Sequence, residues 1–215
     1  MRRHSLPLLL AAGMLAGCPE SSPSPPAEQP PEPLTEPGVT FPVSGKLQGP
    51  QAFLSTTEVA GQLQSFSEQA LPGVKVYLAD AKLTPLADGP TVTTAADGTF
   101  SIASPQRAGF LMAKTASASV ALAGFYRTGH PATLSVAGTM VAWKLSEDMA
   151  SHSVAITAID PAKVDAATAL IAKELVNRNL KPDYSLPTWP DGLDRYTYML
   201  QGDFAKTFNA IIPGS

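Results

Sequence analysis

Short segments in which apolar and polar residues alternate, separated by turn-forming pairs, place the strongest constraint on the fold of this 215-residue chain. In the clearest segment, Val74, Val76 and Leu78 alternate with more polar neighbours, which is the period of a strand with one buried face. Pro72-Gly73 directly before it predicts a turn. Short strands with turns between them favour a small antiparallel β-sandwich over roughly residues 39–127. The other strand candidates are 58–66, 91–95, 99–103, 109–114 and 117–126.

A second turn is expected at Ala96-Asp97-Gly98. Two strand candidates, 91–95 and 99–103, flank these three residues, and the arrangement predicts a β-hairpin. Gly98 should take a positive φ there, because glycine has no Cβ to clash in that conformation. Alternation after the turn then places Phe100 and Ile102 on one face of the second strand.

The period of the apolar residues lengthens after about residue 129, which indicates helices. Asp160-Pro161 predicts a helix start, because an aspartate can cap the first turn and proline suits the first helical position. This helix should run to about residue 179, a second should begin at Asp191, and a third should cover 139–149. Residues 153–159 could add a strand. The expected stripes of the first two helices are Val164, Ala167, Ile171 and Leu175, and Leu193, Tyr196, Leu200, Phe204, Phe208 and Ile211.

We therefore expect an α+β fold in which a sandwich over 39–127 is followed by a mainly helical region over 128–215. The helices should pack on the sandwich or on one another, because they are too few to enclose a separate large core.

The first 18 residues have the pattern of a secretory signal peptide. Arg2 and Arg3 are followed by a mostly apolar run over 6–15, which is far shorter than the roughly 20 residues of a membrane-spanning helix. The run ends in Leu15-Ala16-Gly17-Cys18, which resembles a bacterial lipobox. The resemblance implies removal of residues 1–17 and acylation of Cys18, which would attach the chain to membrane lipid. Pro19, in place of the aspartate that retains many such proteins at the inner membrane, favours an outer-membrane lipoprotein facing the periplasm or the cell surface.

Proline dominates the segment that follows the cysteine. Eight of the residues 19–37 are proline, and Leu34 is the only large aliphatic residue among them. Such a segment cannot bury a core and samples extended conformations, so we expect a disordered tether over 18–38.

A second resemblance lies in the strand region. The runs Val59-Ala60-Gly61-Gln62-Leu63, Leu71-Pro72-Gly73-Val74-Lys75-Val76-Tyr77-Leu78 and Thr94-Ala95-Ala96-Asp97-Gly98-Thr99-Phe100-Ser101-Ile102 resemble a carboxypeptidase regulatory-like domain. The resemblance implies a prealbumin-like β-sandwich. It also implies a non-catalytic module, because domains of this family do not cleave peptides.

The motifs of common catalytic and metal sites are missing from the sequence. Beyond the expected signal peptide there are two histidines, His130 and His152, and no HExxH or cysteine pair, so we expect no metal and interpret both as surface or turn residues. No G-x-S-x-G elbow occurs, so we expect no catalytic residue. The segment 38–46 ends in Ser44-Gly45-Lys46, but its glycine spacing does not fit a phosphate-binding loop.

The charged residues bear on two further questions, the kind of partner and the role of the acidic pairs. Residues 18–215 hold 13 basic and 18 acidic side chains, which argues against nucleic acid as a partner. The acidic pairs Glu147-Asp148 and Asp191/Asp194 are expected to be helix caps or solvated charge. No small-molecule cofactor is expected.

Tyr184 and Trp189 are the candidate ligand contacts, because they lie near prolines where exposed rings can stack on a partner. The sequence thus predicts a membrane-anchored, non-catalytic envelope lipoprotein that acts in adhesion, scaffolding or protein interaction, with an envelope protein or glycan as partner. A carbohydrate-binding module for cell-wall or extracellular glycan is the alternative, and a hydrolase with an unrecognised site is a third possibility.

Overall fold

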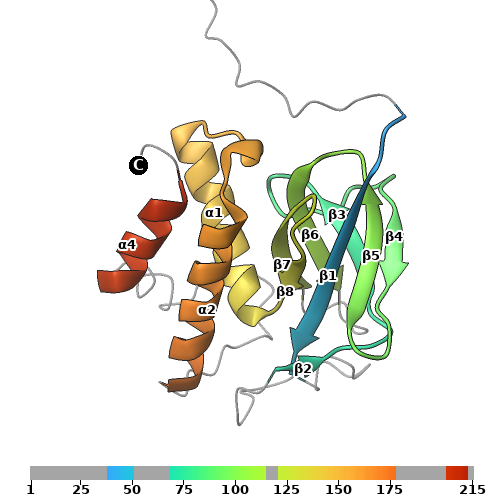
Figure 1. Cartoon of the computed structure of the whole chain (residues 1–215), viewed down its shortest axis with the longest axis horizontal. Helices are drawn as coiled ribbons and strands as arrows, with labels where there is room; N and C mark the ends of the chain where they lie inside the picture. Colours follow the sequence, from blue (N-terminus) through green and yellow to red (C-terminus); the bar gives the residue numbers. More distant parts are fainter. Residues whose placement is uncertain (1–37, 51–67, 115–120, 178–201, 213–215) are drawn as a thin grey trace, which may run out of the picture.

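The computed structural model describes residues 38–50, 68–114, 121–177 and 202–212, which form an α+β fold of two sheets and a group of helices (Figure 1). The expected fold class is confirmed at this level. The helices lie to one side of the sheets, next to β7 and β8, and β4 lies farthest from them. The helical elements are α1 (Val136–His152), the short 3-10 helix η2 (Ile156–Ala158), α2 (Pro161–Asn177) and α4 (Gly202–Ile211).

Each sheet has four strands, and every pairing is antiparallel except that of β8 with β1. The first sheet holds β1 (Phe41–Gly49), β2 (Gln69–Ala70), β5 (Thr99–Ser104) and β8 (Ala132–Leu134). The second has the order β4-β3-β6-β7, with bounds Thr91–Thr93, Lys75–Ala79, Ala108–Lys114 and Ala121–Arg127.

The core extends from between the sheets to beneath the helices. In β3, Val76 and Leu78 are buried and Lys75 is exposed, as the alternation predicts. In β6 every residue from Ala108 to Ala113 is buried, so this strand is covered on both faces. Helix α1 packs on β7, and η2 packs on β6. Residues of both sheets and of the helices belong to one continuous apolar cluster, so the helices complete the core that the two sheets share.

The two sheets meet where β7 approaches β8. An isolated bridge joins Ala123 of β7 to Ser135, the residue that caps the start of α1. The Thr139 hydroxyl accepts the Ala123 N–H at 2.8 Å and donates to the Ser135 carbonyl at 2.6 Å. The first turn of α1 is therefore fixed on the edge of the second sheet.

The predicted hairpin is wrong, although its turn forms as expected. Gly98 has φ +77°, and the Asp97 carboxylate accepts the N–H and hydroxyl of Thr99 at 3.0 and 2.6 Å, which lowers the pKa of Asp97. However, β4 pairs with β3 and β5 pairs with β1, so the turn crosses from one sheet to the other. A turn sets the direction of the chain locally, whereas the partner of each strand depends on distant residues. The buried hydroxyl of Thr94, for example, donates to the Leu71 carbonyl at 2.6 Å and holds the end of β4 beside the turn that precedes β3.

The other strand predictions had mixed outcomes. The candidates 109–114 and 117–126 correspond to β6 and β7, the latter beginning at residue 121 in the described part, and 58–66 lies outside the described residues. The strand expected over 153–159 is wrong: this stretch contains η2, and its alternating apolar side chains pack on the core without a strand partner. Three strands, β1, β2 and β8, were not predicted individually, and β2 has only two residues. Pro42 and Gly45 weaken the pattern of β1, and β8 has only three residues.

The helix predictions hold where the structure describes the chain. Helix α2 begins at Pro161 as expected, and its stripe of Val164, Ala167, Ile171 and Leu175 is buried. Helix α1 contains the predicted 139–149 and extends beyond it at both ends. Helix α4 coincides with the last part of the helix expected from Asp191, whose earlier residues lie outside the described ranges.

One buried hydrogen bond ties the two sheets together, and its removal should be measurable. Ser104 Oγ at the end of β5 lies 2.6 Å from the Tyr126 hydroxyl of β7. We expect Tyr126→Phe to lower the free energy of unfolding by about 1 kcal/mol, the typical net value of a hydrogen bond. Urea denaturation of this variant, of Ser104→Ala and of the double variant would measure the coupling. Fully additive losses would contradict the proposed link between the sheets.

Candidate functional site

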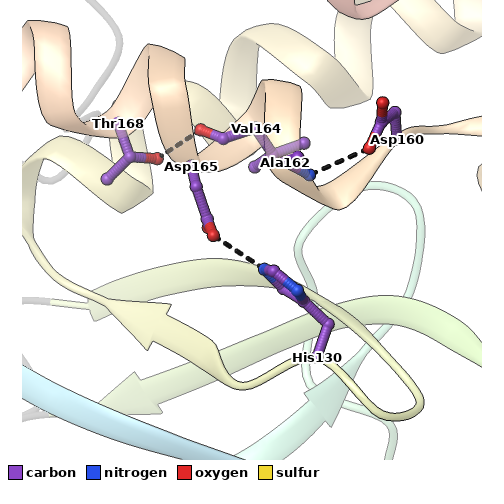
Figure 2. Close-up of polar contacts among 6 residues, drawn as sticks. All are labelled: His130, Asp160, Ala162, Val164, Asp165 and Thr168. Atoms are coloured by element: carbon purple, nitrogen blue, oxygen red, sulfur yellow. Dashed lines mark hydrogen bonds and ion pairs between the residues drawn. The ribbon is translucent and has the colours of Figure 1, made fainter.

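The polar contact that most resembles a functional pair joins His130 to Asp165 (Figure 2). His130 lies in the turn between β7 and β8, directly after Gly129 with φ +81°. Asp165 lies in the second turn of α2, a helix whose start is capped by Asp160 through the Ala162 N–H at 3.0 Å. His130 Nε2 is 2.7 Å from Asp165 Oδ2, and the two side chains are 32% and 54% exposed.

A carboxylate on one imidazole nitrogen orients the ring, as it does in a catalytic triad, but a triad also needs a hydroxyl or thiol on the other nitrogen. Within the described ranges no such group is bonded to His130. The nearby Thr168 hydroxyl donates to the Val164 carbonyl at 2.9 Å, so it stays within its own helix (Figure 2). The arrangement therefore serves best as a link between the β7–β8 turn and α2.

A second contact reinforces this link. Arg127 Nη1, at the end of β7, donates to the Ile159 carbonyl just before α2 at 2.9 Å. His130 and Arg127 together attach the β7–β8 turn to the start of α2 at two points. The prediction that His130 is a turn residue is confirmed, whereas its partner 35 positions away carried no sequence signal.

Glu68 occupies the N-terminus of α1. Its Oε1 accepts the Val136 N–H at 2.8 Å, and the Ser135 side chain accepts the Gly138 N–H at 2.9 Å. Burial raises the pKa of Glu68 to about 7, because removal from water disfavours the carboxylate more than the Val136 N–H stabilises it. The positive end of the helix is thus already occupied by a carboxyl group of the protein itself. No feature of the sequence pointed to this residue.

Lys144 and Asp148 form an ion pair on α1 in which both side chains are largely buried, being 9% and 15% exposed. The expectation that Glu147-Asp148 is solvated charge or a cap holds for Glu147, which is exposed, but is wrong for Asp148. Asp148 is one helical turn from Lys144, so packing that buries the lysine stem also draws in the carboxylate. The four-residue spacing is the signal that would have revealed this pair.

The remaining sequence candidates separate into two groups. His152 is exposed at the end of α1, which confirms its surface assignment, and 41–46 forms a strand with β5, so these residues are not a loop. The others lie outside the described residues: the lipobox Leu15, Ala16, Gly17 and Cys18, the aromatic residues Tyr184 and Trp189, and the acids Asp191 and Asp194.

Among the described residues, no group of three or more His, Cys, Asp or Glu side chains is arranged to hold a metal ion. In the same part of the chain, no helix is both long and apolar enough to cross a membrane. Comparison with known proteins found no family model that matches this chain and no curated protein with significant similarity.

Proposed function

We propose that this chain is a membrane-anchored, non-catalytic envelope lipoprotein whose folded part is an adhesion, scaffolding or protein-interaction module. The observation that carries the proposal is the motif Leu15-Ala16-Gly17-Cys18, placed directly after a basic start and a short apolar run. Cys18 is the only cysteine, so acylation of this residue would leave no thiol for catalysis. Two or three acyl chains, each contributing about 0.8 kcal/mol per buried methylene, anchor a protein stably.

The polar contacts of the folded part support a non-catalytic role. His130, Glu68 and Lys144 each bond to a group that belongs to a neighbouring element or to the same helix. These contacts hold the sandwich and helices together, and such a rigid body suits presentation of a surface. The proline-rich segment 19–37 would separate that body from the lipid headgroups.

The finer fold assignment, a prealbumin-like sandwich of the carboxypeptidase regulatory-like kind, is part of this proposal. Two of the resembling runs contain a turn that leads into a strand: Gly73 and Val74 precede β3, and Asp97-Gly98 precedes β5. Gly61-Gln62-Leu63 lies outside the described residues, but Gly45-Lys46-Leu47 in β1 has the same spacing. The Leu47 N–H donates to the Gly98 carbonyl at 2.9 Å, which brings this triplet next to the Asp97-Gly98 turn.

Metabolic labelling with an alkyne fatty acid tests the anchor. In a bacterial host, we expect the full chain to incorporate the label and to stay in the membrane fraction after a high-salt wash. Cys18→Ser should lose the label completely and move to the soluble fraction, since no other cysteine can replace it. Ser22→Ala is the matched control and should behave like the parent chain. A labelled Cys18→Ser variant, or an unlabelled parent chain, would refute the proposal.

The interaction role needs a separate experiment. Crosslinking in intact envelopes, followed by purification of the tagged full chain, should enrich the same partner in repeated preparations. Failure to enrich any envelope protein or glycan, with Cys18 labelled as expected, would refute the interaction role and leave the anchor intact.

A further inference from the structure

Two lysines stand directly opposite each other on the second sheet. In the antiparallel pairing of β3 with β6, Lys75 is the register partner of Lys114, and both are exposed. Like charges at directly opposite positions destabilise a sheet, and cross-strand Cβ atoms are only about 5 Å apart. Among the described residues, neither lysine forms an ion pair with a carboxylate. The fold therefore gains nothing from placing these two charges together.

The neighbours of the two lysines extend the surface with groups that can bind a ligand. Residues paired in register lie on the same face of a sheet, so Thr93 of β4 lies beside Lys75. Tyr77 is two positions further along β3 and therefore on the same face, where it lies beside Thr91. Both threonines are exposed, and Tyr77 is half-buried. We call Lys75, Lys114, Thr91, Thr93 and Tyr77 the Lys75–Lys114 face.

The charge of this face contrasts with that of the whole chain. The formal net charge is -3, yet no described strand residue on this face is acidic. Asp97, in the turn after β4, bonds to Thr99 and interacts electrostatically with Lys46 of the other sheet. The helices leave the face open at this end, because they pack on β7 and β6 whereas β4 lies farthest from them (Figure 1).

We propose that the Lys75–Lys114 face binds an acidic polysaccharide. Two ammonium groups on flexible stems can pair with carboxylates along a sugar chain, the threonine hydroxyls can bond to sugar hydroxyls, and the Tyr77 ring can pack against an apolar sugar face. Two lysines are fewer than the clusters of four to eight basic residues that attach proteins to anionic membranes. This inference rests on the proposed interaction role and names its partner class.

Binding of the detergent-purified full chain to polygalacturonate, with dextran as the neutral polymer, tests the inference. We expect binding to polygalacturonate that weakens with added salt, and about tenfold weaker binding for the double variant Lys75→Gln/Lys114→Gln. The matched control, Lys82→Gln/Lys173→Gln, removes two exposed lysines elsewhere and should bind within twofold of the parent chain. Urea denaturation should show that Lys75→Gln/Lys114→Gln is at least as stable as the parent chain, because the like-charge contact is removed.

The inference would be overturned by no binding to polygalacturonate, by equal binding to dextran, or by an equal loss of binding in the two double variants. Competition identifies the class of anion, since short galacturonate oligomers should displace the polymer. Displacement by glycerol phosphate at lower concentrations would instead indicate a lipid headgroup and would also overturn it. Fatty-acid labelling reports on Cys18 alone. A chain that is labelled but does not bind polygalacturonate would therefore refute binding by the Lys75–Lys114 face and leave the proposed lipid anchor intact.

Discussion

Gly98→Ala should lower the free energy of unfolding by about 3 kcal/mol. Gly98 has φ +77°, a conformation that costs a residue with a Cβ roughly 1 to 2 kcal/mol. A Cβ at this position would also lie 2.5 Å from the Leu47 carbonyl oxygen and 3.2 Å from the Ala70 Cβ. The carbonyl belongs to the backbone of β1, so the contact can be relieved only by moving a strand. The two effects should add, because one is local to residue 98 and the other lies between strands.

Gly73→Ala is the matched control for this experiment. Gly73 also has a positive φ, +71°, but a Cβ there would meet nothing within 4 Å. Its substitution should therefore cost only the conformational term, about 1 kcal/mol. Urea denaturation of both variants would separate the two contributions. Equal losses would show that the approach of β1 to the turn does not constrain residue 98.

Glu68→Gln should be more stable than the parent chain at pH 8. The difference in free energy of unfolding, variant minus parent, should be about 2 to 3 kcal/mol larger at pH 8 than at pH 5. The pKa of Glu68 is raised from 4.5 to about 7 in the folded protein, so the folded state holds the proton more tightly than the unfolded state. The stability of the parent chain must then fall as the pH rises from about 4.5 to about 7, and level off above that range. A shift of this size corresponds to about 3 kcal/mol at most. Glutamine stays neutral and keeps an acceptor for the Val136 N–H.

The difference between parent and variant should be measured by urea denaturation at pH 5, 6, 7 and 8. Comparison of the two chains at equal pH cancels the contributions of all ionisable groups that both chains contain. Asp88→Asn is the control, because it converts an exposed acid in the β3–β4 loop to its amide and should change stability equally at every pH. A Glu68→Gln difference that does not grow between pH 5 and pH 8 would show that Glu68 is ionised in the folded protein throughout this range.

Some of the polar contacts described above could be predicted from the sequence, and others could not. His130 was recognisable as a turn residue from its neighbours Gly129 and Pro131. Its bond to Asp165 depends on how α2 packs on β7, and no local pattern encodes that packing. Glu68 is an ordinary surface residue type in the sequence, and it becomes unusual only because α1 begins above it, 68 residues later. The Lys144–Asp148 pair was accessible from its spacing, but its burial was not.

The sequence by itself determined the local geometry of this protein. The turn glycines, the buried face of β3, and the start of α2 at Pro161 follow from residues adjacent in the chain, because steric limits on φ, side-chain alternation and helix capping act over a few positions. The tertiary structure alone decided the partners: the assignment of β4 and β5 to different sheets, the parallel pairing of β8 with β1, and the meeting of Lys75 with Lys114. Strand pairing joins residues tens of positions apart, and only burial of the shared core selects among the possible registers.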